Sequence, residues 1–368
     1  MVIAINARFL AKPVQNETDI FLLQVLQQII ADNPEHRFFF ISDQPLAGSV
    51  PFPANITVII AGPVCKNGFN NSWWQRFTLP RLLKKHKADV YFSPAGTGSL
   101  YTRVPQFLLV TDVGYLTKPE LYTGTGLRRT KQLSLLLQKG AKMIALSDSE
   151  KQILQEHYKL SLTAVTVIKP FTSKYFTPIQ YEQKKQVKET YTNGCEYFFF
   201  SGSLHARNNL LGLLKAFSKF KKRQQSNWKL VIAADSEDKE FMSRLQTYKH
   251  KDDVVLLTNI SETVLTGLTA AAYAYVAPVS YEGVGIHLLQ AMKCKVPVIS
   301  SIQSNLYALA PDAALYVDPD NIDDIAQQMM LLYKDENLCR KLSEKGSLFA
   351  GEYNNPSAAE QLWQTIAE

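Results

Sequence analysis

The sequence predicts an α/β protein with two doubly wound, Rossmann-like domains, and three observations support this fold class. Short apolar runs, typical of strands buried on both faces, alternate with segments whose apolar residues recur at helical spacing. The alternation stops at residues 169–180, a polar stretch with two prolines, and then begins again. The length of 368 residues is enough for two or three domains, each with its own core.

The first half is expected to form one parallel sheet with helices between its strands. The helix expected at 73–85 should break before Pro80, which lacks a backbone N–H. We expect this domain to occupy residues 1–170. Strands are expected at residues 2–6, 37–42, 56–61, 89–93, 106–111, 143–147 and 164–168, and helices at 20–31, 73–85, 127–139 and 149–158.

The second half repeats the pattern after a linker at 171–180. Its domain is expected at 181–354, and a final helix at 355–368 is able to cross back to the first domain. Strands are expected at 197–201, 229–233, 254–257, 275–279, 296–300 and 314–317, and helices at 208–222, 236–248, 262–272, 286–294, 321–334, 336–349 and 356–367.

Composition limits the protein classes. A hydrophobic content of 46% and a charged content of 20% are typical of soluble globular proteins. No run approaches the length of a membrane-spanning helix, and the N-terminal residues read as a first strand, not a signal peptide. The four cysteines form no Cys-x-x-Cys pair, which argues against a disulfide framework or a zinc site and favours a reducing cytoplasm.

The net charge of +7 is concentrated in basic clusters at 84–87, 128–131 and 221–223. Two interpretations stay open: solvated helix faces, or attraction to phosphates or to an anionic membrane surface. Nucleic acid is not an expected partner, because no binding motif accompanies the charge.

Two glycine turns are expected at the carboxyl ends of strands, where doubly wound sheets bind ligands. Gly202 follows the strand at 197–201, and Glu282 to Gly285 follow the strand at 275–279. Glycine lets the backbone approach a ligand, and a helix start offers N–H groups to an anion. Arg207 could add a guanidinium to this anion site or simply cap an exposed helix. The turns suggest a ligand with phosphates and sugar hydroxyls.

Three segments carry a resemblance to a known family. Residues 202–210, Gly-Ser-Leu-His-Ala-Arg-Asn-Asn-Leu, resemble the Gly-Thr-Leu-x-x-Arg-Lys-Asn-Leu segment of retaining nucleotide-sugar glycosyltransferases of the GT-B fold, family four (group 1). Residues 282–299 resemble that family's Glu-Gly-Phe-Gly-Leu-Pro-x-x-Glu-Ala-Met-Ala-Cys-Gly-Val-Pro-Val-Ile, and 312–319 its Asp-Ala-Ala-Leu-x-Val-Asp-Pro. The N-terminal half resembles it more thinly, through 6–10 and the strand ending in Asp112.

The resemblance implies a role for each matching position. The turn at 202–207 would face the donor diphosphate, Glu282 the transferred sugar, 258–260 the base and Gln290 the ribose. Asp112 would orient the acceptor or hold backbone; both stay open. The donor-binding residues are then Gly202, Ser203, Asn208, Thr258, Asn259, Ile260, Gly283, Val284, Gly285, Ile286 and Gln290, and the catalytic residues Glu282, Asp112 and Arg207. The family implies neither metal nor other cofactor, because cationic side chains and helix ends stabilise the leaving diphosphate.

Several positions depart from the family pattern. Loss of one cationic phosphate contact could raise the barrier by about 2–4 kcal/mol, by analogy with removal of an oxyanion donor. The departures are Asn208 for lysine, Gln290 for glutamate, Thr111 for histidine, His287 for proline, Lys295 for glycine, and residues 13–20 in place of a glycine-rich loop.

The main hypothesis is therefore a metal-independent, retaining glycosyltransferase. It would move a sugar from a UDP- or GDP-sugar to a glycan or lipid-linked acceptor, in the cytoplasm or at the inner face of the membrane. The alternative is an inactive or impaired relative that binds nucleotide-sugar or acts as a scaffold partner. A third, less favoured hypothesis is a related fold with other chemistry, such as an epimerase.

Overall fold

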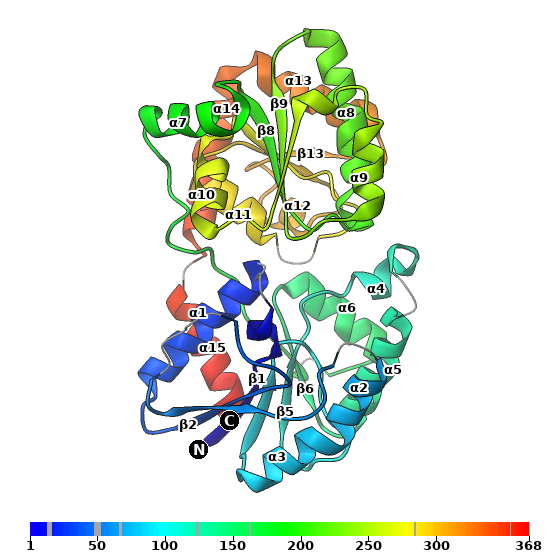
Figure 1. The fold of residues 1–368 in the computed structure, drawn as a ribbon, viewed down its shortest axis with the longest axis vertical. Helices are drawn as coiled ribbons and strands as arrows, with labels where there is room; N and C mark the ends of the chain where they lie inside the picture. The colour runs from blue at the N-terminus through cyan, green and yellow to red at the C-terminus, as the bar shows by residue number, and fades with distance from the viewer. Residues whose placement is uncertain are drawn as a thin grey trace. The chain divides into compact units, whose positions relative to one another are not determined.

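The computed structural model describes residues 1–12, 17–47, 53–65, 68–122, 125–161, 163–282, 285–353 and 355–367. The chain divides into two compact units. Unit 1 comprises Met1–Pro170 together with Asn355–Glu368, and unit 2 comprises Phe171–Asn354. Each unit is an α/β layer structure around one parallel sheet (Figure 1), so the predicted fold class is confirmed.

Unit 1 contains a seven-stranded parallel sheet in the order β3-β2-β1-β4-β5-β6-β7. Its inner strands are almost wholly apolar and buried, as a sheet covered on both faces requires. The strands are β1 (Val2–Asn6), β2 (Arg37–Ser42), β3 (Ile56–Ile60), β4 (Val90–Ser93), β5 (Gln106–Leu109), β6 (Lys142–Ala145) and β7 (Val165–Val167).

The helices of unit 1 cover both faces of this sheet. Helices α1 and α15 pack together on one face, and α2, α3 and α5 lie on the other (Figure 1). The helices are α1 (Glu17–Asp32), α2 (Gly68–Trp73), α3 (Leu79–Lys85), α4 (Gly114–Thr117), α5 (Thr125–Gln138), α6 (Asp148–Tyr158) and α15 (Asn355–Ala367), with short 3-10 turns at Arg8–Ala11 and Pro119–Leu121.

The helix expected at 73–85 is interrupted before Pro80, as predicted, but by a π-helical segment, Trp74–Thr78, between α2 and α3. Pro80 lies in the first turn of α3, where a missing N–H leaves no intrahelical bond unmade. The irregular segment also separates the roles of two adjacent tryptophans. Trp74 is fully buried and donates Nε1–H to the carbonyl of Ala61 at 3.1 Å, whereas Trp73 is 47% exposed.

Unit 2 contains a six-stranded parallel sheet in the order β10-β9-β8-β11-β12-β13. A single hydrophobic core, centred on the aromatic run Tyr197–Phe200, joins this sheet to its helices. The strands are β8 (Tyr197–Gly202), β9 (Lys229–Ala234), β10 (Val254–Thr258), β11 (Ala274–Val276), β12 (Val298–Ser301) and β13 (Leu315–Val317).

Helices α8 and α13 pack against each other in unit 2, as do α11 and α14. The helices are α7 (Tyr181–Thr192), α8 (Leu210–Gln224), α9 (Lys239–Gln246), α10 (Glu262–Ala271), α11 (Ile286–Lys293), α12 (Asn305–Leu309), α13 (Ile322–Lys334) and α14 (Glu336–Gly351), with 3-10 turns at Ala206–Asn208 and Lys251–Asp253.

Both sheets reverse their strand order beside their first strand. In unit 2 the chain moves from β8 to β9 and β10 on one side, and then returns to β11 on the other side. Right-handed crossovers therefore place helices on opposite faces, and a crevice opens at the carboxyl ends of β8 and β11. This topology fixes where a ligand site of unit 2 is expected.

Candidate functional site

The strand register aligns two of the predicted donor-site positions, Gly202 and Thr258, at one edge of the unit 2 sheet. Gly202 at the end of β8 pairs with Ala234 of β9, and Ala234 pairs with Thr258 at the end of β10. Asn259 follows Thr258 with a φ of +54°, so the backbone turns directly after the strand, before Ile260. The turn after β8 and the turn after β10 thus start at the same level of the sheet.

The turn after β8 depends on Gly202 and closes on itself. Gly202 has a φ of +131°, a conformation that L side chains rarely adopt. The Asn208 amide donates to the carbonyl of Ser203 at 2.6 Å and contacts the Ser203 hydroxyl at 3.1 Å. Asn208, which replaces the family's lysine, therefore ties the two ends of the turn together with a neutral group.

Backbone contacts join this turn to the segment that follows β11. The Arg207 carbonyl accepts a hydrogen bond from the Ser280 N–H at 2.7 Å. The Asn209 amide donates to the carbonyl of Pro278 at 3.0 Å and to that of Pro319 at 2.6 Å. These bonds hold the two predicted halves of the donor site in one rigid arrangement.

Glu282 lies in the second turn and is held there by Ser304. The Ser304 hydroxyl donates to Glu282 Oε2 at 2.6 Å, and the two residues form a parallel β-bridge. A Cβ atom on Gly285, which has a φ of +69°, would lie 3.6 Å from that carboxyl group. The carboxyl thus packs against Gly285, directly before helix α11 begins at Ile286. Gly283 and Val284 lie outside the described residues.

Burial raises the pKa of the Glu282 carboxyl above its ordinary value. The hydrogen bond from Ser304 and the electrostatic influence of His287 and Arg207 lower this pKa and only partly offset the effect of burial. Arg207 from the first turn and His287 at the start of α11 thus form, with Glu282, a corner whose electrostatic effect favours the charged form of the carboxyl. Such a corner suits a ligand that carries both hydroxyl groups and an anion.

His287 connects the two turns through a buried polar network. Its Nδ1 lies 3.1 Å from the Ser201 hydroxyl and 3.3 Å from Gln290 Oε1. The Ser201 hydroxyl is also 3.3 Å from the Tyr275 hydroxyl. The other ring nitrogen, Nε2, would lie 3.5 Å from a Cβ on Gly202. The imidazole therefore stands against the glycine backbone of the first turn.

Gln290 is buried, whereas a residue that contacts a ribose would be expected to lie at the surface of the site. Its side chain is 1% exposed, and its Oε1 is bonded to His287. A ribose contact stays a prediction. Lys295, which replaces the family's glycine, is exposed beyond the C-terminal end of α11, whereas Ile286 begins that helix at the site.

Asp112 belongs to unit 1, in the segment after β5. Its carboxylate accepts a hydrogen bond from the Gly114 N–H at 2.8 Å. The Tyr122 hydroxyl lies 2.9 Å and 3.1 Å from its two oxygens. The sequence left two roles open for Asp112, orienting the acceptor or holding the backbone. The bond to the Gly114 N–H matches the second role, and contact with an acceptor stays a prediction.

Sequence reasoning missed the partners that position Glu282. Ser304 lies 22 residues further along the chain, and no local motif links it to Glu282. In the sequence, His287 stands out only as a replacement for the family's proline, and Ser201 and Tyr275 only as strand residues. The available signal was topological: Ser201 and His287 each adjoin a glycine turn at neighbouring strand ends.

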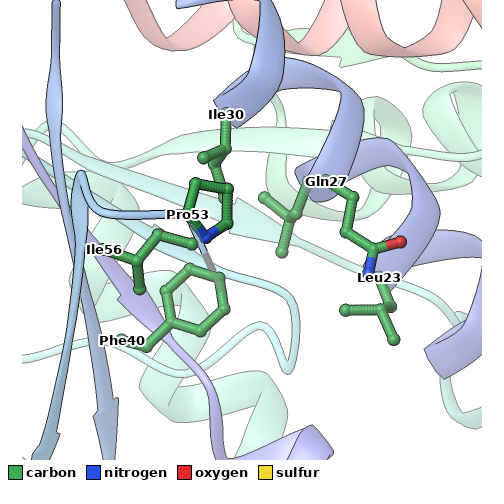
Figure 2. A pocket seen from close by; sticks show the side chains of 7 residues that line it. Leu23, Gln27, Ile30, Phe40, Pro53 and Ile56 are labelled. Atoms are coloured by element: carbon green, nitrogen blue, oxygen red, sulfur yellow. The ribbon is translucent and has the colours of Figure 1, made fainter. Parts of the chain in front are cut away.

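Three further features concern metal binding, membrane spanning and cavities in the described part of the chain. No cluster of three or more His, Cys, Asp or Glu residues there is arranged to hold a metal ion. None of its helices has the length and apolar character needed to cross a bilayer. A largely apolar cavity of about 210 Å³ lies in unit 1, apart from the donor-site residues (Figure 2). It is lined by Leu23, Leu26, Gln27, Ile30, Phe40, Pro53 and Ile56.

Comparison with known proteins agrees with the resemblance seen in the sequence. Residues 182–349 match the family described as Glycosyl transferases group 1. The chain is 23% identical over 247 residues to O-antigen chain mannosyltransferase B of Escherichia coli, and the match covers 66% of this chain and 65% of that protein. It is 28% identical over 181 residues to O-antigen chain mannosyltransferase RfbU of Salmonella typhimurium, covering 49% and 47%. The chain thus spans less than two thirds of these curated relatives.

Solved structures show the same fold. The glycosyltransferase WaaG, involved in lipopolysaccharide biosynthesis, superposes with a TM-score of 0.80 at 15% identity, covering 100% of this chain and 99% of that one. Anabaena Alr3699/HepE in complex with UDP and glucose superposes with a TM-score of 0.76 at 13% identity, again covering 100% and 99%. The chain therefore has the GT-B fold, and its residues 182–349 are similar to the group 1 glycosyltransferases.

Proposed function

We propose that this protein transfers a sugar from a nucleotide-diphosphate donor to a glycan or lipid-linked acceptor, with retention of anomeric configuration. The observation that carries this proposal is the pair of joined turns: Ser304 holds the Glu282 carboxyl in the second turn, and the Ser280 N–H bonds that segment to the Arg207 carbonyl of the first. These turns lie at the strand ends where doubly wound sheets bind ligands.

The charges of the corner suit the parts of such a donor. Arg207 and the start of α11 offer positive potential to the diphosphate, whose negative charge grows as it departs. The Glu282 carboxyl, held by Ser304, would accept hydrogen bonds from hydroxyls of the transferred sugar. Cationic side chains would thus take the place of a metal ion, and neither metal nor another cofactor is part of this proposal.

The names of the matched relatives support a hexose donor of the mannose type. Two are O-antigen mannosyltransferases, and Anabaena Alr3699/HepE was solved with UDP and glucose. A GDP- or UDP-hexose is the donor class to test first. We place the reaction in the cytoplasm, where nucleotide-sugars and reduced cysteines occur together.

A donor panel tests the proposal. The protein is incubated with UDP- and GDP-sugars, with and without lipid-linked glycan, and nucleotide release is measured against Glu282→Gln. Release that is faster with acceptor and that depends on Glu282 supports the transferase. Release equal to that of Glu282→Gln with every donor contradicts it. Product anomer analysis by NMR then tests retention, and unchanged activity in EDTA tests metal independence.

Asn208 favours a second candidate function. In it, the protein is an impaired relative that binds nucleotide-sugar or serves as a scaffold. The Asn208 amide is bonded within the turn, where the family's lysine would provide a cation. Stabilisation by about 2.7 kcal/mol at a hundred times the dissociation constant, without turnover, would indicate a binder. Turnover rescued by Asn208→Lys, Gln290→Glu and Thr111→His together would show that only the chemistry is lost.

A further inference from the structure

We propose that the outer face of the helical run α2–α3 in unit 1 is a docking surface for an anionic lipid bilayer. We call Phe69, Trp73, Phe77 and Tyr101 the aromatic ridge, and Arg76, Arg81, Lys84, Lys85 and Lys87 the cationic flank. This inference concerns residues outside the donor site and does not depend on the proposed reaction. Helices α2 and α3 lie on the face of the unit 1 sheet that α1 and α15 leave uncovered (Figure 1).

The helical run has a buried face that holds it on unit 1. Trp74, Leu79 and Leu83 are 0%, 0% and 1% exposed and pack with core residues of β1, β2 and β4. The Arg8 guanidinium stacks over the Trp74 ring at 5.3 Å. Because the inner face is filled, the exposed side chains of this run, such as Trp73 and Arg76, point away from the sheet.

The outward side chains are large aromatic rings. Phe69 is 75% exposed, Trp73 47% and Tyr101 56%. The rings of Phe69 and Trp73 lie 6.5 Å apart, and those of Trp73 and Phe77 lie 4.6 Å apart. A continuous ridge of exposed rings leaves apolar area in water, which marks an interaction site rather than scattered surface residues.

Cationic groups lie directly among these rings. The Arg76 guanidinium stands 5.4 Å from the Phe77 ring centre and 5.1 Å from that of Tyr101, and the Arg81 guanidinium stands 5.8 Å from the Phe77 ring centre. The sequence contains six Lys or Arg and no Asp or Glu between Asp43 and Asp89. No acidic residue of the segment neutralises this charge.

An anionic bilayer fits both features together. Aromatic rings favour the level of the lipid headgroups, and Lys and Arg near the surface are attracted by anionic lipids. An amphipathic helix with Trp and Phe on one face and cations beside them lies in the plane of that interface. Nucleic acid would also match the charge, and single strands can stack on exposed rings, but no nucleic-acid-binding motif accompanies the three exposed rings of this segment.

Vesicle co-sedimentation tests the surface with the full-length chain. We expect binding to phosphatidylcholine vesicles that contain 30% phosphatidylglycerol, and about tenfold or greater loss for Phe69→Ser/Trp73→Ser. Arg81→Gln/Lys84→Gln should lose about 30-fold, since each cation near the surface contributes about a factor of five. The controls are Tyr181→Ser, at a residue 75% exposed in unit 2, and Lys222→Gln/Lys249→Gln, at exposed lysines. Both should bind like the wild type.

Brominated lipids provide a second measurement that needs no loss of binding. They should quench wild-type tryptophan fluorescence and should quench Trp73→Phe much less, because Trp73 is the tryptophan on the ridge. The proposal is overturned if the wild type stays in the supernatant, if the control variants lose binding as the ridge and flank variants do, or if DNA displaces the protein from vesicles at equal phosphate concentration.

Discussion

The two sheets have the same strand order around their first strand, but the side chains at their carboxyl edges differ in chemistry. At the edge of unit 1, polar groups pair with one another: the Asn6 amide donates to the Thr97 hydroxyl at 3.1 Å, and Arg8 lies 3.3 Å from Asp43. At the edge of unit 2, Gly202 and Gly285 adopt positive φ in the turns after β8 and β11, and the Glu282 carboxyl accepts a hydrogen bond from Ser304 in the second of these turns. Topology thus supplies a crevice in each unit, and the turn residues decide whether a ligand can use it.

The largest expected effect is a difference in kcat between variants of Glu282 and of Asp112. Glu282→Gln should lower kcat by about 100- to 1,000-fold, because a charged acceptor of sugar hydroxyls is lost from the reacting centre. Asp112→Asn should lower kcat less and should instead lower the free energy of unfolding by about 1–2 kcal/mol, through weaker bonds to Gly114 and Tyr122. Steady-state kinetics and urea unfolding measure the two quantities. A larger kinetic loss for Asp112→Asn would mean that unit 1 carries the chemistry.

A smaller effect is expected when Gly202 is changed to alanine. Gly140, a glycine of unit 1 that also has a positive φ, is the matched control. A Cβ on Gly140 would meet no atom within 4 Å, so it reports backbone strain alone. Each change to alanine should lower the free energy of unfolding by about 1–2 kcal/mol.

Only Gly202→Ala should also weaken binding of UDP or GDP, by about tenfold, because its Cβ enters the diphosphate turn. Calorimetric titration measures this binding. Equal nucleotide affinity in the two variants would remove Gly202 from the site.

The smallest expected effect is the pH dependence of stability at Glu282. Its pKa is raised in the folded state, so the folded protein binds the proton more tightly than the unfolded chain does. Stability from this group is present below the ordinary glutamate pKa and is lost as pH rises through the raised value. Urea unfolding of wild type should therefore weaken relative to Glu282→Gln between pH 4 and pH 7. A difference that stays constant over this range would contradict the raised pKa.

Strands and most helices of both units followed directly from the sequence, because strands buried on both faces read as continuous apolar runs. Helix α7 (Tyr181–Thr192) was not expected. Its sequence, Tyr-Glu-Gln-Lys-Lys-Gln-Val-Lys-Glu-Thr-Tyr-Thr, has hardly any apolar stripe, and its ends depend on capping by Gln180 and on Asn193 in a left-handed conformation. Such a helix carries little hydrophobic periodicity for a sequence pattern to detect.

The glycine turns of the site were predictable because glycine and strand ends are local signals. Its polar network was not, because Ser201, His287 and Gln290 meet across strands and side-chain direction decides their contacts. Gln290 is an example of a residue whose contacts the sequence could not predict. Its position in the motif suggests a surface contact, whereas the structure buries it against His287.

Unit 1 is completed late during synthesis, because its helix α15 follows unit 2 in the sequence. The buried face of α15, Ala358, Ala359, Leu362 and Ile366, packs with α1, and Trp363 contacts the His36 ring at 5.0 Å. The ribosome makes these residues only after all of unit 2. The nascent first unit therefore leaves the apolar side of α1 open while unit 2 is being translated, and it is in that interval that a chaperone or protease would distinguish it from the finished protein.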